Sequence, residues 1–437
     1  MSYADFLAAK MRRHGEHGTE CTPDQVNPWL KDWQREIVAW AVRKGRAAMW
    51  EDTGLGKTVQ QIEWARLSAN DFTASDNVGR ALIVAPLAVC QQTIREAAKI
   101  GVDARYLRED DGRPGLIVTN YEMASRFDPT TLAAVVLDEA SILKASDGKT
   151  RTMLIKHFAP VRARLACTAT PAPNDPEELT SQAEFLDVMP RVEMLAAYFI
   201  HDDSGWRLKK HAVAPMYRWM TSWAVALRRP SDIGYSDSGY ILPPLNVIPE
   251  IVHVEMDAPD GQLFRADIGG VGGRAQVRKE TLAERVQRAI DLVKAEPDEP
   301  WLLWAGLNAE ADALAAGIPG AVNVEGNWKP EDKAAALLDF ADGKIQYLVT
   351  KPSIASMGLN FQHCARMAFV GLNDSWEAYY QAIRRCWRYG QTRPVDAHIV
   401  LSQLESQIAA NIQRKEHQTS RMVDGLVAAM HTEWSKA

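Results

Sequence analysis

The 437-residue chain contains 46% hydrophobic and 24% charged residues, the balance of a globular protein, which excludes a disordered or fibrous chain. Its net charge of −6 at pH 7 excludes a histone-like protein that coats nucleic acid, but permits a motor whose basic contacts are confined to one cleft. The five cysteines are scattered without paired spacing, so neither a disulfide framework nor a four-cysteine zinc site is expected.

At roughly 100–200 residues per domain, this length predicts two or three domains. No apolar run approaches the roughly 18 residues that a membrane-spanning helix needs. The first residues lack the apolar core of a signal peptide. We therefore expect a cytoplasmic protein.

Short apolar or β-branched runs alternate with longer helical stretches in both halves of the chain. In the first half these runs are 81–85, 115–119, 134–138 and 164–168, and in the second half they are 301–305, 346–350, 366–370 and 397–401. Continuous apolar runs between helices are typical of buried parallel strands in α/β layers. Because the pattern occurs twice, we expect two α/β domains.

The composition changes between the two halves, where residues 200–245 mix tryptophans with Lys and Arg. The Gly/Ser/Asp-rich stretch 234–239 and Pro243-Pro244 then break any helix. We expect a helical insert whose tryptophans (Trp206, Trp219 and Trp223) either pack on the first domain or stack on bases. The predicted boundaries are a tail over 1–24, a first domain over 25–195, the insert and linker over 196–247, a second domain over 248–405 and a helical tail over 406–437.

The strongest local pattern is Glu51-Asp-Thr-Gly-Leu-Gly-Lys-Thr58, which lies between an apolar strand and a helical run. Gly54 and Gly56 would let the backbone wrap closely around phosphates, and the start of the helix adds a positive dipole. Lys57 would reach the β- and γ-phosphates, and Thr58 would hold Mg²⁺. The general pattern has a glycine where Glu51 stands, so the match to a phosphate-binding loop is incomplete.

A predicted strand at 134–138 ends in two carboxylates, Asp138 and Glu139. Beside a phosphate-binding loop, Asp138 suits Mg²⁺ coordination and Glu139 suits orienting the attacking water. About thirty residues later, Thr168-Ala-Thr-Pro171 follows the next predicted strand. Its hydroxyls could hydrogen-bond the acidic pair and respond to the γ-phosphate.

A basic segment, Gln381 to Gln391, lies far from the loop in sequence. Arg385 and Arg388 are three residues apart, so on a helix they would share one face. Two guanidiniums projecting together suit a γ-phosphate reached from a second domain. The competing interpretations are a solvated helix face or contacts with nucleic-acid phosphates, to which Arg384 and Arg393 are also suited.

In this order, the segments resemble the motif series of Snf-type ATPases of helicase superfamily two. The resemblance runs from about Leu30 to Leu401 and includes the entry motif Leu30–Gln34, motif I (Glu51–Thr58), motif Ia (Leu82–Leu87), Val118–Glu122, motif II (Asp138–Ser141), motif III (Thr168–Pro171, with Asn174, Glu178 and Leu179), motif V (Met357–Phe361) and motif VI (Gln381–Gln391). It implies two tandem RecA-like domains with a cleft between them.

The resemblance also implies a set of site residues. Catalytic roles would fall to Lys57, Asp138, Glu139, Arg385 and Arg388. Thr58 and Asp138 would bind Mg²⁺, and ATP would be contacted by Gln34, Thr53, Gly54, Leu55, Gly56, Lys57, Thr58, Gly358 and Gln381. The chain departs from the family at Ser141, where motif II usually has histidine, and at Lys333, where arginine is common.

The implied function is an ATP-driven translocase on double-stranded DNA, in the compact form carried by bacteria and bacteriophages. A strand-separating DNA or RNA helicase and a module in which ATP only switches DNA affinity remain as alternatives. A nuclease or a replication or repair protein is a possible partner, and the expected location is the cytoplasm of a bacterium or a phage-infected host cell.

Overall fold

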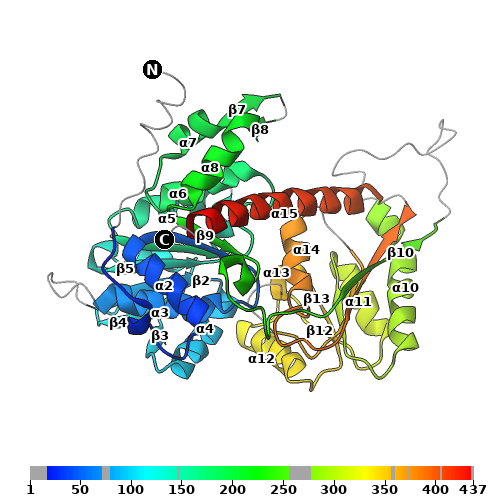
Figure 1. Ribbon diagram of the computed structural model, residues 1–437. Helices are drawn as coiled ribbons and strands as arrows, with labels where there is room; N and C mark the ends of the chain where they lie inside the picture. Colours follow the sequence, from blue (N-terminus) through cyan, green and yellow to red (C-terminus); the bar gives the residue numbers. More distant parts are fainter. Residues whose placement is uncertain are drawn as a thin grey trace. The chain divides into compact units, whose positions relative to one another are not determined.

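The computed structural model describes residues 17–70, 79–144, 148–203, 205–254, 277–355, 360–371, 375–403 and 406–434. The chain divides into two compact units (Figure 1). Unit 1 comprises Met1–Tyr240 and Gln418–Ala437, and unit 2 comprises Ile241–His417. Among the described residues, no helix is both long and apolar enough to cross a membrane.

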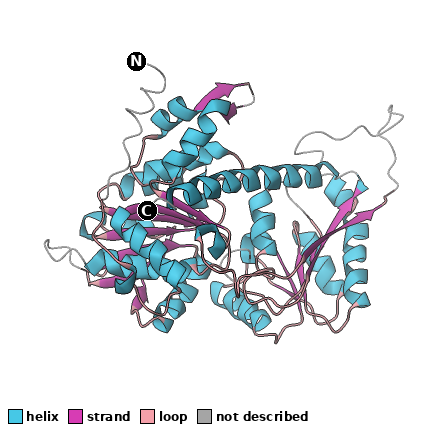
Figure 2. Cartoon of the chain, viewed as in Figure 1, coloured by secondary structure: helices cyan, strands magenta, loops and turns pink. Residues whose placement is uncertain are grey.

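Unit 1 is built on a seven-stranded sheet with the order β3-β4-β2-β5-β6-β1-β9. Every pairing in it is parallel. Its strands are β1 (Arg46–Glu51), β2 (Arg80–Ala85), β3 (Ala104–Tyr106), β4 (Gly115–Asn120), β5 (Ala134–Asp138), β6 (Ala163–Thr168) and β9 (Ala224–Leu227). Its helices are α2 (Asp32–Lys44), α3 (Lys57–Asn70), α4 (Leu87–Lys99), α5 (Lys149–His157), α6 (Leu179–Phe185), α7 (Arg191–Tyr198) and α8 (Val213–Met220) (Figure 2).

Side chains from the two faces of this sheet enter two different hydrophobic cores. Along β1, Ala48 and Trp50 belong to one core, and Ala47 and Met49 belong to the other. Because successive residues of a strand point to opposite faces, a strand that is covered on both sides must be apolar throughout. This explains why the strands of unit 1 appear in the sequence as continuous apolar runs.

Unit 2 has a six-stranded parallel sheet with the order β10-β15-β14-β11-β13-β12. Its strands are β10 (Leu245–Val252), β11 (Trp301–Trp304), β12 (Val322–Asn323), β13 (Tyr347–Thr350), β14 (Arg366–Phe369) and β15 (Val395–Ser402). Its helices are α10 (Leu282–Ala295), α11 (Asn308–Gly317), α12 (Pro330–Ala341), α13 (Pro352–Ala355) and α14 (Trp376–Ile383). The two expected α/β domains, each with a parallel sheet, are therefore confirmed.

Short 3-10 turns and one long helix complete the secondary structure. The turns are η1 (Pro23–Gln25), η2 (Ala124–Arg126), η3 (Pro129–Thr131), η4 (Ala140–Lys144), η5 (Pro176–Glu178), η6 (Lys210–Ala212) and η7 (Pro230–Ile233). Helix α15 (Ser406–Trp434) follows β15, and its residues from Gln418 onward belong to unit 1. There Met422 and Leu426 enter the core, and the Met430 sulfur accepts the backbone N–H of Ala226 at 3.4 Å.

The prediction of a helical insert and linker over 196–247 is wrong in part. This stretch contains an antiparallel hairpin of β7 (Phe199–Asp202) and β8 (Gly205–Leu208), then α8, and then β9, which pairs with β1 at the edge of the sheet. Strand β10 also begins inside the expected linker. A four-residue apolar run such as 224–227 has too few residues for its period to distinguish a strand from a helix.

The predicted N-terminal tail over 1–24 lies outside the described residues up to position 16. Beyond that point it is packed against the end of α2. The backbone N–H groups of His17 and Gly18 donate to the carbonyls of Lys44 and Arg43, and Cys21 is buried. The residues from 17 onward therefore form part of unit 1.

Candidate active site

The loop between β1 and α3 has the backbone of a phosphate-binding loop. Gly54 and Gly56 have φ values of 93° and 82°, in the left-handed region that favours glycine. A Cβ on Gly56 would also lie only 2.5 Å from Nε2 of Gln34. That amide, from α2, donates to the carbonyl of Leu55 at 2.8 Å. The residue expected at the adenine therefore lies directly against the loop.

Lys57 and Thr58 form the first turn of α3, where the helix dipole favours anions. The Lys57 ammonium donates to the carbonyls of Glu51 at 2.6 Å and Asp52 at 3.0 Å. Two backbone oxygens therefore hold it at the loop. Thr53 is placed by its own backbone N–H, which donates to the Asp52 carboxylate at 2.6 Å.

Glu51 is fully buried at the end of β1. Nε2 of Gln60 donates to its Oε2 at 2.7 Å, and its Oε1 has no hydrogen-bond partner among the described residues. Burial raises the pKa of Glu51 to about 7, against the opposing effects of the Lys57 charge and the Gln60 hydrogen bond. In the sequence, Glu51 is visible only as a departure from the glycine pattern. Because it is the last residue of a buried strand, an inward-facing carboxyl could have been predicted at this position.

Asp138 ends β5 and accepts a hydrogen bond from Nε2 of Gln61 at 2.9 Å. Burial raises its pKa, while the Gln61 bond and the Lys57 charge act in the opposite direction. Gln61 lies on α3, three residues after Thr58, so the helix that begins at the loop also orients the carboxylate. The sequence analysis did not identify this amide, because its partner is distant along the chain.

Glu139 adopts φ of 65°, a conformation that is uncommon for a residue with a side chain and that often occurs at functional sites. The hydroxyl of Thr168 donates to its Oε1 at 2.5 Å, and the Ser141 hydroxyl donates to the same oxygen at 3.1 Å. The expected hydrogen bond from motif III to the acidic pair is thus present. Ser141, the departure from the motif II histidine, supplies the second bond.

Sheet order explains why these groups meet. Strands β5, β6 and β1 are neighbours in a parallel sheet, so their carboxyl ends lie side by side, where α/β proteins bind ligands. They carry Asp138, Thr168 and the phosphate-binding loop respectively. The site therefore follows from strand order as well as from the motifs themselves.

The residues present fit ATP with Mg²⁺. Gly54 and Gly56 give the loop the left-handed backbone turns of a phosphate cradle, and Lys57 supplies a cation. Within the described part of the chain, no group of three or more His, Cys, Asp or Glu side chains could hold a metal ion. Mg²⁺ is commonly held by one or two protein ligands together with substrate phosphates, which matches Thr58 and Asp138.

In unit 2, the arginines of motif VI are not arranged as predicted. Helix α14 ends at Ile383, so Arg385 and Arg388 lie in the following turns and not on one helix face. Arg385 is buried and donates to the Gln381 carbonyl at 2.9 Å and to its side-chain oxygen at 2.8 Å. After Ile383 the backbone hydrogen bonds span three residues and not four, since the N–H groups of Arg385 and Cys386 donate to the carbonyls of Ala382 and Ile383.

Arg384 and Arg393, which are also suited to nucleic-acid phosphates, have partners inside unit 2. Arg384 is 2% exposed, with its guanidinium 4.8 Å from the ring centre of Trp387. Arg393 bonds both carboxylate oxygens of Glu299, at 3.0 and 2.8 Å. Glu299 is distant from Arg393 in sequence, and the contact between Arg384 and Trp387 depends on the turn after α14. Residue spacing alone therefore could not predict either contact. Gly358, expected at the nucleotide, lies outside the described residues.

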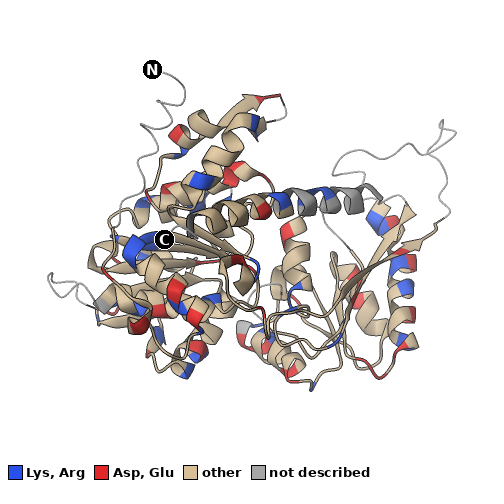
Figure 3. Cartoon of the chain, in the orientation of Figure 1, with Lys and Arg blue, Asp and Glu red and all other residues tan. Residues whose placement is uncertain are grey.

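The packing interpretation of two insert tryptophans is confirmed. Trp223 is fully buried and Trp219 is 4% exposed, and their ring centres lie 5.4 Å apart. Trp206 is half-buried against His201 in the hairpin. Figure 3 shows Lys and Arg interspersed with Asp and Glu along the helices of each unit, as the modest net charge suggests.

Comparison with known proteins finds a similarity to helicase domains within the second half of the chain. A model of the helicase conserved C-terminal domain matches residues 286–390. The "DNA annealing helicase and endonuclease ZRANB3" of Mus musculus is 27% identical over 176 residues, which cover 38% of this chain and 16% of that protein. The Bos taurus protein of the same name is 25% identical over 176 residues, with the same shares covered. The chain thus matches only a small part of the length of these relatives.

Among solved structures, the Sulfolobus solfataricus SWI2/SNF2 ATPase core in complex with dsDNA aligns with 96% of this chain and 97% of its own length, at 17% identity and a TM-score of 0.44. The matched helicase domain follows the ordered motifs of the first half of the chain. In this part of the sequence the chain is therefore similar to proteins that contain a helicase domain.

Proposed function

We propose that the protein couples ATP hydrolysis to movement along double-stranded DNA. The observation that carries the proposal is the hydrolytic carboxylate: Glu139 is oriented by Thr168 and Ser141 at the same sheet edge as the phosphate-binding loop. The relatives' names supply the nucleic-acid class, since they refer to DNA annealing and to dsDNA. DNA would stimulate ATP hydrolysis, and hydrolysis would drive translocation along the duplex.

The roles of the residues follow from their chemistry. Lys57 would leave the two carbonyls that now hold it and neutralise the β- and γ-phosphates, while Gln34 would contact the adenine. Thr58 and Asp138 would hold Mg²⁺, which supplies charge neutralisation of the phosphates. Glu139 would align the attacking water, since hydrolysis requires a nucleophile in line with the γ-phosphate.

Unit 2 would contribute the arginines. We propose that Arg385 and Arg388 stabilise charge on the γ-phosphate in the transition state, with Gly358 and Gln381 at the nucleotide. Because these groups and the loop belong to different units, DNA that favours the active arrangement would stimulate hydrolysis. A nuclease or a replication or repair protein is the proposed kind of partner.

The test compares ATPase rates with duplex DNA, single-stranded DNA and RNA, using Lys57→Ala to measure background hydrolysis. We expect duplex DNA to stimulate at least as well as single-stranded DNA. A triplex-displacement assay should then show ATP-dependent movement on intact duplex. Strong stimulation by RNA with none by duplex DNA would overturn the proposal. Separation of a plain duplex would instead favour a strand-separating helicase.

A further inference from the structure

A buried amide links the phosphate-binding loop to motif III in unit 1. Gln182 of α6 is 1% exposed. Its side-chain oxygen accepts the indole N–H of Trp50 at 2.8 Å, and its side-chain nitrogen donates to the carbonyl of Pro171 at 2.8 Å. One side chain therefore uses both of its polar ends within the protein interior.

Each end of this link leads to the reacting groups. Trp50 directly precedes Glu51, where the loop begins, and lies beside Thr168 in the β1–β6 register. Pro171 closes motif III, three residues after the Thr168 hydroxyl that binds Glu139. Gln182 thus connects the strand that carries the loop with the turn that orients the carboxylate.

The motif III turn lies beyond the end of the sheet, where the Thr170 N–H donates to the Thr168 hydroxyl oxygen at 3.0 Å. Strand β6 ends at Thr168. The Thr170 hydroxyl is buried and has no hydrogen-bond partner among the described residues. Proline has no N–H with which to anchor the chain. The Pro171 carbonyl is therefore a point at which a side chain can fix this turn.

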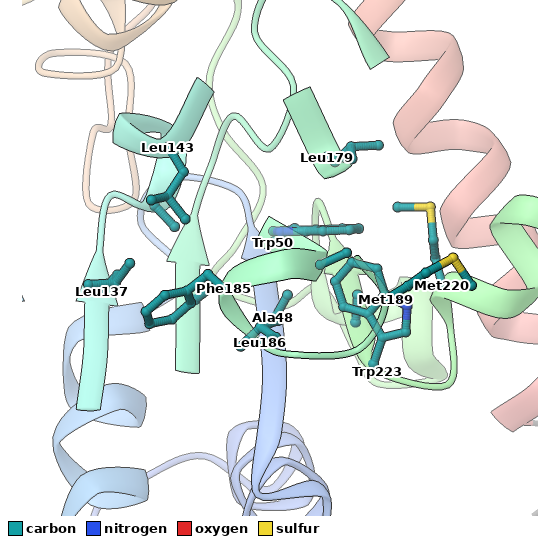
Figure 4. Close-up of a cluster of buried hydrophobic side chains, with 14 of the residues drawn as sticks. Ala48, Trp50, Leu137, Leu143, Leu179, Phe185, Leu186, Met189, Met220 and Trp223 are labelled. Atoms are coloured by element: carbon teal, nitrogen blue, oxygen red, sulfur yellow. The ribbon is translucent and has the colours of Figure 1, made fainter. Parts of the chain in front are cut away.

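The Trp50 end is itself held firmly. Its ring meets Trp223 edge-on, with centres 5.4 Å apart and planes at 84°. Figure 4 shows Trp50 and Trp223 in one apolar cluster with Leu179 of α6 and Leu186. In such close-packed surroundings a hydrogen-bonded amide has one orientation, so displacement at one end is transmitted to the other.

We propose that Gln182 is a positioning residue for ATP hydrolysis: it holds the motif III turn, and through Thr168 the Glu139 carboxylate, in register with the phosphate-binding loop. This inference rests on the proposed hydrolytic role of Glu139. Loss of the Gln182 side chain should affect turnover and not nucleotide binding, since Lys57 and the loop backbone remain in place.

The test measures kcat and KM for ATP at saturating DNA, together with nucleotide affinity, for Gln182→Leu and Trp50→Phe. Each substitution breaks the link and leaves an apolar side chain in the core. We expect kcat to fall by about 10- to 100-fold, because small misplacements remote from the reaction have effects of this size. Nucleotide affinity should change by less than about twofold, and the double variant should be no slower than the slower single variant.

Trp223→Phe is the matched control, because it removes an indole from the same cluster, and the Trp223 N–H has no hydrogen-bond partner among the described residues. An equal fall in kcat in Trp223→Phe would show that loss of packing is sufficient and would overturn the inference. Normal kcat in folded Gln182→Leu would overturn it as well. If Gln182→Leu does not fold, Trp50→Phe decides alone. Should Glu139→Gln hydrolyse normally, the proposed function fails; should only Gln182→Leu do so, this inference alone fails.

Discussion

The acidic half of the site and the arginine segment are held in different ways. Asp138 and Glu139 are oriented by side chains from other elements, Gln61 of α3 and Thr168 of β6. Arg385 is instead held by Gln381, a residue of its own segment. The first arrangement is fixed by the order of the strands. The second depends on local turns outside the sheet, which would suit the transition-state role that we propose for Arg385 and Arg388.

The largest expected effect concerns Arg388. Arg388→Ala should lower kcat by about 10³-fold or more, which corresponds to about 4 kcal/mol, while KM for ATP changes far less. DNA affinity without nucleotide should barely change. Steady-state kinetics and DNA titrations against salt test this, with exposed Arg218→Ala of α8 as a control. Normal kcat with a salt slope reduced by about one unit would place Arg388 on DNA phosphates instead.

Glu139→Gln should reduce turnover by roughly 10²- to 10⁴-fold, the usual contribution of a positioned general base. ATP should bind nearly normally, because the amide keeps the shape of the side chain and can still accept the Thr168 bond. Lys57→Ala should weaken nucleotide binding as well as turnover. Equilibrium binding and single-turnover rates separate the two variants. Near-normal turnover in Glu139→Gln would remove this carboxylate from the mechanism.

Thr168→Val keeps the volume of a fully buried residue and removes the hydroxyl that orients Glu139. We expect kcat to fall by roughly tenfold, about 1.4 kcal/mol, with unchanged ATP affinity. Thr350→Val is the matched control, since Thr350 is also buried at the end of a parallel strand, but lies in unit 2 and bonds the Val324 carbonyl. Equal losses in both variants would indicate a general effect on folding.

The last expected effect is on stability and not on turnover, and it concerns Glu51. Its folded pKa of about 7 lies above the ordinary value of 4.5, because burial disfavours the charged form. Stabilisation by the protonated form is therefore complete below about pH 4.5 and is lost as pH rises through 7. Glu51→Gln should avoid this loss and gain on the order of 3 kcal/mol relative to the parent between these limits.

Urea unfolding of unit 1 at several pH values between 5 and 8 measures this difference for Glu51→Gln. The exposed Glu193→Gln on α7 serves as the control. If the free energy of unfolding of Glu51→Gln differed from that of the parent by the same amount at every pH, Glu51 would have the same pKa in the folded and unfolded protein. The acidic half of the site would then be less strongly desolvated than its burial indicates.

The sequence by itself determined both parallel sheets and the positions of the acidic pair and the glycine loop. Strands covered on both faces must be apolar throughout, and Gly54 and Gly56 occupy backbone conformations that few other residues adopt. Both requirements act on neighbouring residues, so they are visible as local patterns. The Thr168–Glu139 bond was predictable because carboxyl ends of parallel strands share one edge.

The tertiary structure alone decided the features that depend on distant partners. Strand β9 is a strand because β1 presents an open edge to it, and Arg393 is paired because Glu299 lies beside it. The end of α14 separates Arg385 and Arg388 from the helix on which spacing had placed them. The Trp50–Gln182–Pro171 link joins residues more than a hundred positions apart. Burial and hydrogen bonding over such separations arise only when the chain is packed, so no local pattern records them.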